Sequence, residues 1–168
     1  MYKLRVVYSK QDDAKFIPFN YMGKIFERVL RRIEFPFSFS EGYTKHIKIS
    51  FAPAIPVGVS GNNEAFDILS EEKIDTEEFK EKTNKILPSG MKIKECFYID
   101  ISDKISSVKQ ALYIIKKNID VKDYTGPWEV VSEDLQMATF KINLLNFKHK
   151  ILFDKFGIEN IIERKLII

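Results

Sequence analysis

His46 is the residue of this chain best suited to acid–base chemistry, because histidine titrates near neutral pH without help from its surroundings. Lys45 and Lys48 flank it in the sequence, and ammonium groups at that spacing can hold a phosphate. Two interpretations are open. Either His46 is a general acid or base beside lysines that stabilise phosphate charge, or it satisfies backbone groups at the entry to a strand.

Basic residues follow one face of a helix that we expect over residues 20–33. They are Lys24, Arg28, Arg31 and Arg32. Arginine suits bidentate contact with phosphate, so this stripe predicts a face that binds nucleic acid. The alternative is a solvated helix face on which Glu27 and Arg31 form an i,i+4 ion pair.

A Ser-Glu-Gly turn joins this helix to the segment that carries His46. Glu41 and Gly42 lie in the turn, where glycine supplies a positive φ and lets a ligand approach the backbone. Aromatic residues near the turn either stack on bases or belong to the core: Phe37, Phe39, Tyr43 and Phe51. Two carboxylates farther on, Glu64 and Asp67, are interpreted as exposed and solvated.

The chain offers no standard metal or cofactor motif, so we expect neither. Cys96 is the only cysteine, and with two histidines it cannot complete a closed zinc site or an iron–sulfur site. No glycine-rich phosphate loop is present. No apolar run approaches the roughly 20 residues that span a bilayer. We therefore predict a cytoplasmic protein with no membrane partner.

Positive charge is concentrated in the first third of the chain. Residues 1–60 carry ten Lys and Arg against five Asp and Glu, a net charge of +5. The remaining 108 residues carry seventeen against nineteen, a net charge of −2. An anionic partner for the N-terminal third is the physical expectation.

The elements that must position these residues follow the order strand, helix, strand, strand, helix, strand. The turns between them include a polar turn at 11–15 and a Gly-rich turn at 58–63. Asn20 is the expected N-cap of the first helix, and Asp75 with Glu78 forms a capping box for the second. The predicted strands and helices cover residues 2–9, 20–33, 37–40 with 48–57, 64–69, 75–87 and 91–99. Residues 1–100 are therefore predicted to form a ferredoxin-like βαββαβ unit.

Residues 101–168 are predicted to form a second, shortened ferredoxin-like half. Residues 118–127 are too few for a full helix, so this unit is incomplete. A helix competes with the strand at 108–117, and Gly157 ends a short helix near 150–156. The predicted strands cover residues 108–117, 128–131, 137–145 and 161–168. The predicted fold is α+β, with tandem ferredoxin-like units packed as one body.

Three segments of the chain resemble one bacterial family. Residues 26–32 (FERVLRR) resemble its F-E-R-A-L-R-R-A helix, and residues 40–52 (SEGYTKHIKISFA) resemble its S-E-G-F-N-P-H-P-K-I-S-F-A segment. Residues 56–67 resemble its P-L-G-V-x-S run with E-x-x-D. The chain is thus similar to the radical SAM-linked domain family of unknown function, closely over residues 2–100 and loosely to the end. The resemblance implies a separate radical SAM iron–sulfur protein as partner.

The chain departs from that family just before the first helix. The family has Ser-His-Leu-Asp where this chain has Pro18-Phe19-Asn20-Tyr21, so a His and an Asp are missing. Their loss favours binding over catalysis, because the other polar motif residues are retained: Arg28, Arg31, Arg32, Glu41, His46 and Lys48. A fold-level similarity to CRISPR repeat-RNA-processing proteins points the same way.

These observations predict a non-catalytic accessory domain that binds RNA and presents it to a radical SAM enzyme. The predicted RNA-binding residues are Lys24, Arg28, Arg31, Arg32, Glu41, Gly42, Lys45, His46 and Lys48. Two alternatives stay open. One is a metal-independent endoribonuclease that uses His46, and the other is a protein-interaction module that docks through sheet edges or residues 161–168.

Overall fold

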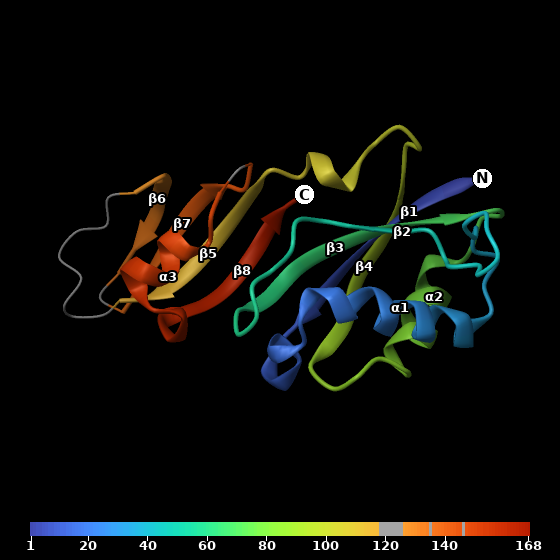
Figure 1. Cartoon of the computed structure of the whole chain (residues 1–168), viewed down its shortest axis with the longest axis horizontal. Coiled ribbons are helices and arrows are strands. Elements are labelled where there is room, and N and C mark those ends of the chain that lie inside the picture. Colours follow the sequence, from blue (N-terminus) through green and yellow to red (C-terminus); the bar gives the residue numbers. More distant parts are fainter. Residues whose placement is uncertain (118–125, 135, 146) are drawn as a thin grey trace.

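The computed structural model describes residues 1–117, 126–134, 136–145 and 147–168. Within these residues it contains three α-helices and one eight-stranded mixed sheet. The strands follow the order β4-β1-β3-β8-β5-β7-β6, and β2 also pairs with β3. Figure 1 shows the sheet along the long axis of the molecule, with α1 and α2 near one end and α3 near the other. The prediction of a mixed helix-and-strand fold is confirmed.

The N-terminal part of the sheet is fully antiparallel. In it β1 lies between β3 and β4, and β2 lies on the other side of β3. Alternate residues of β1 point toward the helices, which places Leu4, Val6 and Tyr8 in the core. The strands are β1 (Tyr2–Lys10), β2 (Ile49–Phe51), β3 (Ser60–Ser70) and β4 (Met91–Ile99).

Helix α1 (Phe19–Ile33) packs its apolar stripe onto this sheet. Its Phe26 ring is fully buried, with centroids 4.4 Å from Phe66 and 5.0 Å from Tyr8. The expected N-cap at Asn20 is wrong, because Pro18 occupies that position with extended backbone. Proline suits the entry to a helix, where its missing N–H removes no internal hydrogen bond.

Helix α2 (Thr76–Asn84) begins where the capping residue predicts. The Asp75 carboxylate accepts hydrogen bonds from the backbone N–H groups of Glu77 and Glu78, both at 2.9 Å. The helix ends at Asn84, earlier than the predicted residue 87, and the Asn84 side chain pairs with β4. Its amide donates to the Ile93 carbonyl at 3.0 Å and accepts from the Ile93 N–H at 2.7 Å.

Residues 37–57 are less regular than the sequence predicts. Phe37 and Phe39 form isolated bridges to Ser70 and Ile47 rather than a strand. The chain leaves the sheet after β2, since the prolines at 53 and 56 cannot donate to a strand ladder. Strand β3 begins at Ser60, inside the turn expected at 58–63, because the first residues of β3 pair with β8.

The C-terminal part of the sheet repeats the antiparallel pairing. In it β5 lies between β7 and β8, and β6 lies on the other side of β7. Residues 110–116 are a strand, so the competing helix is wrong there, and Gly157 (φ 74°) ends α3 as predicted. Residues 118–127, which are predicted to be too few for a full helix, lie mostly outside the described residues. The elements are β5 (Gln110–Lys116), β6 (Trp128–Glu133), β7 (Met137–Asn143), α3 (Lys150–Phe156) and β8 (Ile161–Ile167).

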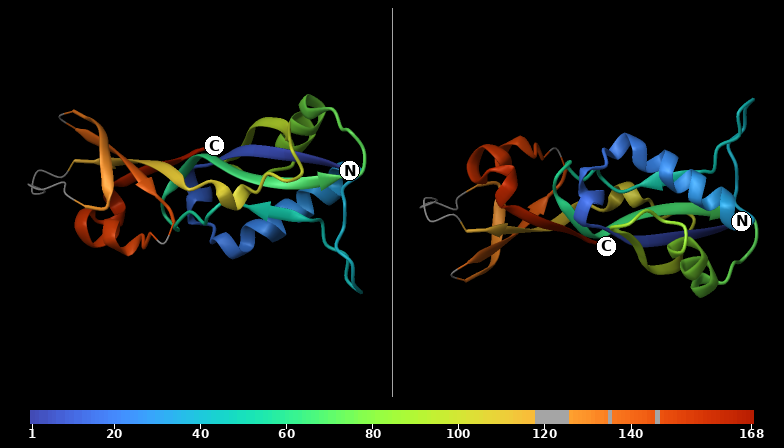
Figure 2. Two further views of the ribbon diagram at one scale, coloured as in Figure 1. Left: turned by 90° about the horizontal axis from the view of Figure 1, so that it is seen from above. Right: turned by 90° about the horizontal axis from the view of Figure 1, so that it is seen from below.

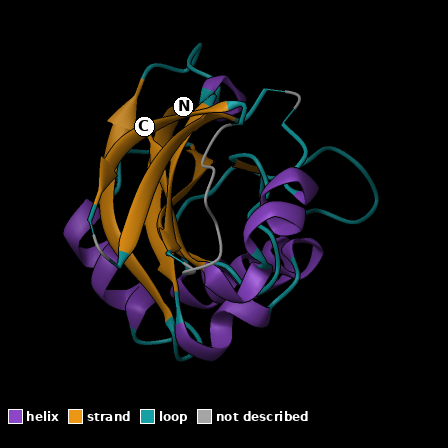
Figure 3. Ribbon diagram, turned by 90° about the vertical axis from the view of Figure 1, so that its left-hand side faces the viewer, coloured by secondary structure: helices purple, strands orange, loops and turns teal. Residues whose placement is uncertain are grey.

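The two parts of the sheet join through a parallel pairing of β3 with β8. Ser60, Gly61 and Asn63 pair with residues 163–165 of β8. There are two hydrophobic cores, and both views of Figure 2 show the C-terminal end of β8 (red) beside the strands of the N-terminal part. Seen along the long axis, helices surround one side and the lower edge of the curved sheet (Figure 3).

A buried ion pair lies at this junction. Arg164 of β8 is fully buried, and its Nε donates to Glu64 Oε1 at 2.9 Å while a second guanidinium N–H contacts Oε2. The remaining donors reach the carbonyls of Pro53 at 2.8 Å and Ala54 at 3.0 Å. Burial lowers the pKa of Arg164, but the Glu64 carboxylate outweighs burial and raises it above its ordinary value. The buried guanidinium therefore stays charged.

Asp67 is buried in a second ion pair on the same strand. It accepts from Arg5 Nε at 2.8 Å and from the Arg5 guanidinium N–H at 3.1 Å. The interpretation of Glu64 and Asp67 as exposed is wrong, since each is 2% exposed. Residues 100–108 cross this face of the sheet near Asp67, and the Ile101 carbonyl there accepts from Lys3 Nζ at 3.3 Å.

Candidate nucleic-acid interface

A short 3-10 helix, η1 (Asp12–Phe16), presents an exposed aromatic ring just before α1. The Phe16 side chain is 57% exposed, yet its backbone is held on both sides. Buried Lys10 donates from Nζ to the carbonyls of Lys15 at 3.3 Å and Ile17 at 2.6 Å. The Lys15 carbonyl also accepts from the Gly58 N–H at 3.0 Å. The exposure of Phe16 is therefore built into the fold and does not come from a loose loop.

Lys10 is an unusual support for this segment, because its side chain is fully buried. Burial lowers the pKa of Lys10, while the nearby Glu64 carboxylate raises it and Arg164 lowers it further. The net direction is downward. A buried ammonium needs partners, and here the partners are the two carbonyls that flank Phe16.

A cavity of about 590 Å³ lies between η1 and the first turns of α1. We call it the basic groove, and its walls include Asp13, Phe16, Tyr21, Lys24, Ile25 and Arg28. The Tyr21 ring is 51% exposed and lies 5.6 Å from Lys24 Nζ. Lys15 Nζ lies 5.1 Å from the Phe16 ring. Cations beside exposed rings can contact phosphates while the rings stack on bases.

Glu27, Arg31 and His46 form a cluster one turn farther along α1. Arg31 donates to Glu27 Oε1 from Nε at 3.1 Å and from a terminal N–H at 2.7 Å. His46 Nδ1 lies 3.0 Å from Glu27 Oε2. Burial raises the pKa of Glu27, but hydrogen bonds from Arg31 and His46 outweigh it and lower that pKa below its ordinary value. The cluster is anionic at its centre and cationic at its rim.

This cluster fastens the loop at 40–46 to the helix. Arg31 also contacts the Lys45 carbonyl and lies over the Phe39 ring at 5.4 Å. The backbone of His46 exchanges hydrogen bonds with Ser40, which accepts through Oγ at 3.0 Å and donates through its N–H at 2.7 Å. The ring of His46 is nevertheless 61% exposed. The sequence-predicted Glu27–Arg31 pair is confirmed.

The comparison with protein families supplies the assignment. Residues 3–149 match the family described as "Uncharacterized protein conserved in bacteria (DUF2344)". The chain belongs to this family. A search of curated proteins finds no match. The match includes η1, α1 and the loop that carries His46, so both the basic groove and the Glu27 cluster lie within it. The DUF2344 description names no radical SAM or B12-binding protein.

The predicted binding residues of this DUF2344 protein fall into separate places. Lys24 and Arg28 line the basic groove, whereas Arg31, Lys45 and His46 belong to the Glu27 cluster. The other predicted residues lie elsewhere. Arg32 is exposed near the end of α1, and Glu41 and Gly42 (φ 139°) are in the exposed loop. Lys48 lines a different cavity of about 390 Å³, together with Lys3 and Asp67. Of the aromatic candidates, Phe37 and Phe51 pack in or against the core, Phe39 lies under Arg31, and Tyr43 is fully exposed.

Several residues of the candidate site were not predicted from the sequence. Phe16 and Tyr21 are absent from the predicted site, and so are Lys15 and Glu27. A usable signal was present, because residues 15–24 interleave aromatic side chains with lysines. Within the described residues, no group of three or more His, Cys, Asp or Glu could hold a metal ion, and no helix is long and apolar enough to cross a membrane.

Proposed function

We propose that this protein binds RNA through the basic groove and the adjoining face of α1, without catalysing a reaction itself. One observation carries the proposal: exposed Lys24 and Arg28 border a cavity that the exposed rings of Phe16 and Tyr21 also line. Sites for single-stranded nucleic acid combine a cationic track for the backbone with aromatic side chains on which bases stack. The excess positive charge of residues 1–60 adds long-range attraction.

The size and chemistry of the basic groove fit this use. Its volume of about 590 Å³ lies within the range of roughly 300–1,000 Å³ that small-molecule sites occupy, which leaves room for a base and its sugar. Arg28 is exposed and offers the planar guanidinium that binds phosphate with two hydrogen bonds. The carboxylate of Asp13 can accept a hydrogen bond from an amino group of a base.

We also propose that the sheet consists of tandem ferredoxin-like units, the second shortened. The strand orders support this. They are β4-β1-β3-β2 in the N-terminal part and β8-β5-β7-β6 in the C-terminal part. If the strands of each part are counted along the chain, both orders read fourth, first, third, second. Every neighbouring pair within each part is antiparallel. Residues 117–127 separate β5 from β6, a connection shorter than the one that holds α1. The first core is built wholly from residues before 100, whereas the second also includes Ala52, Ile55, Val59 and Ala65 from the N-terminal part.

The proposed partner is a separate radical SAM enzyme, to which the bound RNA is presented. Support for this part comes from the sequence resemblance of residues 26–32 and 40–52 to radical SAM-linked domains. The first segment contributes Arg28 to the basic groove, and the two segments together build the Glu27 cluster one turn farther along α1, so the resembling segments adjoin the proposed RNA surface.

Replacing Lys24→Glu and Arg28→Glu together should weaken RNA binding by about 50-fold in 50 mM KCl. Each lost phosphate contact removes about 0.7 from the slope of log affinity against log salt, so two contacts remove about 1.4. Fluorescence anisotropy with an unstructured 12-nucleotide RNA at several salt concentrations measures both quantities. Circular dichroism of the variant checks that α1 is retained.

The matched control changes the same net charge elsewhere. Lys104→Glu with Lys109→Glu alters two exposed lysines that flank η2 (Ile105–Ser107), away from the basic groove. This control should lose less than about threefold in affinity, because interactions between exposed charges are screened beyond the Debye length, which is roughly 14 Å in 50 mM salt. Equal losses in the two variants, or no loss in either, would contradict a role for the groove.

A metal-independent endoribonuclease is the second candidate, and one observation favours it. The Glu27 carboxylate orients the His46 ring through Nδ1, as carboxylates orient acid–base histidines, and the ring is exposed to a substrate. If this function holds, His46→Ala should abolish cleavage of RNA by the purified protein in the presence of a chelator. Equal cleavage by wild type and variant would remove His46 from the reaction.

A further inference from the structure

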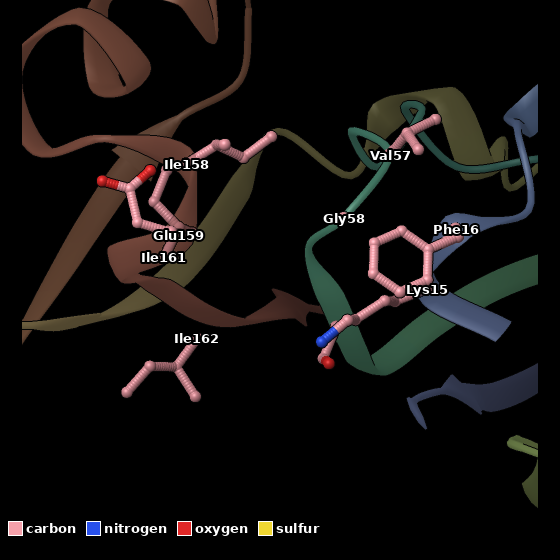
Figure 4. A pocket seen from close by; sticks show the side chains of 9 residues that line it. Lys15, Phe16, Val57, Gly58, Ile158, Glu159, Ile161 and Ile162 are labelled. Atoms are coloured by element: carbon pink, nitrogen blue, oxygen red, sulfur yellow. The ribbon is translucent and has the colours of Figure 1, made fainter. Parts of the chain in front are cut away.

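A second cavity, of about 620 Å³, shares the Phe16 ring with the basic groove. We call it the junction pocket, because its walls come from both parts of the sheet. Figure 4 shows Lys15 and Phe16 of η1 with the Val57–Gly58 turn on one side, and Ile158 and Ile162 on the other. Ile158 belongs to the 3-10 helix η3 (Ile158–Asn160), directly before β8.

The exposed Phe16 ring therefore borders two cavities, and each is large enough to hold a base. The backbone on both sides of Phe16 is held by the Lys10 ammonium and, at Lys15, by the Gly58 N–H, so the segment that carries the ring is fixed between the two cavities. The two faces of an aromatic ring are equivalent stacking surfaces, and each can carry one base.

The charges around Phe16 also suit a nucleic-acid strand that passes over it. Lys15 Nζ lies 5.1 Å from the ring centroid, and Lys15 lines the junction pocket. On the other side, Lys24 and Arg28 line the basic groove. A strand that crosses from one cavity to the other would therefore have a basic side chain beside it in each. Each cavity also carries one carboxylate, Asp13 in the groove and Glu159 in the junction pocket, which disfavours a free polyphosphate there.

On the basis of the RNA binding proposed above, we infer that the RNA is unpaired and that successive bases enter the basic groove and the junction pocket on either side of Phe16. Lys15 contacts the phosphate between them. Paired bases in an A-form duplex remain stacked on their neighbours and cannot enter two cavities separated by a protein ring. The ligand class is accordingly single-stranded RNA, and the surface it occupies extends beyond α1 to the junction of the two parts.

Two measurements on the wild-type chain and its variants test this inference. Fluorescence anisotropy compares an unstructured 12-nucleotide RNA with a 12-base-pair duplex of the same sequence, and the single strand should bind at least about tenfold more tightly. Phe16→Ala should weaken binding of the single strand by about tenfold, a typical loss for one stacking side chain. Its salt slope should stay unchanged, because the ring contacts bases and not phosphates.

Ile158→Asn tests the junction pocket independently of Phe16. Ile158 is 40% exposed, so the change should leave folding intact while it removes an apolar wall and weakens binding about threefold or more. The matched control is Ile101→Asn, which changes an exposed isoleucine that lines neither of these two cavities and should bind as the wild type does.

The outcomes separate this inference from the proposed function. Equal affinity for duplex and single strand, or unchanged affinity in both Phe16→Ala and Ile158→Asn, overturns the two-cavity path. If Lys24→Glu with Arg28→Glu still weakens binding in that case, RNA binding through the groove stands without it. If the charge reversal is also without effect, both ideas fail.

Discussion

Replacing Arg164 by alanine is expected to lower the free energy of unfolding by about 3–5 kcal/mol. The change leaves the Glu64 carboxylate buried without its cation, since Glu64 is 2% exposed and Arg164 is fully buried. It also removes the donors that reach the Pro53 and Ala54 carbonyls at 2.8 and 3.0 Å. Single domains are stable by about 5–15 kcal/mol in total, so this loss is large. Urea unfolding followed by circular dichroism measures it.

The control for this prediction is an arginine that makes no buried contact. Arg32→Ala changes an exposed residue near the end of α1, so it should alter stability by less than about 0.5 kcal/mol. A double variant, Glu64→Leu with Arg164→Met, removes both charges and should recover part of the loss, because an apolar pair of similar size can replace a buried ion pair. A loss below about 1 kcal/mol for Arg164→Ala would contradict the importance of the pair.

Replacing Asp67 by alanine should destabilise the protein by about 3 kcal/mol. Asp67 accepts two hydrogen bonds from Arg5, whose side chain is 11% exposed, and it lies 3.8 Å from Lys3 Nζ. Without the carboxylate, the Arg5 guanidinium loses both of these hydrogen bonds and the stronger of the two acidic neighbours that raise its pKa, Asp67 and Asp103. Urea unfolding at neutral pH again gives the measurement.

A matched carboxylate control distinguishes this pair from a general charge effect. Glu41→Ala removes an exposed carboxylate from the loop at 40–46 and should change stability by less than about 0.5 kcal/mol. The double variant Asp67→Ala with Arg5→Met should be more stable than Asp67→Ala alone. If the single variant unfolds at the same urea concentration as the wild type, the buried pair contributes nothing.

The local chemistry of the sequence predicted much of the secondary structure. The 3.6-residue spacing of Met22, Phe26 and Leu30 identified α1, and Asp75 identified the start of α2. Alternation placed β1 and β4, and Gly157 marked the end of α3. These signals act within a few residues of the chain, so they can be read without knowledge of the fold. The basic stripe on α1 was visible for the same reason.

Local sequence patterns could not predict which residues from distant parts of the chain meet in one site. His46 lies 19 positions from Glu27 in the sequence, and the two meet because Ser40, Arg31 and the Lys45 carbonyl fold the loop back onto α1. Phe16 directly follows the polar turn predicted at 11–15, and the backbone on both sides of it is held by the buried Lys10. Neither contact leaves a periodic pattern in the sequence.

By itself, then, the sequence determined the identity of the helices and most strands, the amphipathic form of α1 and the concentration of positive charge in residues 1–60. The tertiary structure alone decided that Glu64 and Asp67 are buried, that β3 pairs with β8, and that Arg164 meets a carboxylate 100 residues away. The physical reason is that periodicity reports which residues of one element share a face. What covers that face depends on chain segments distant in sequence.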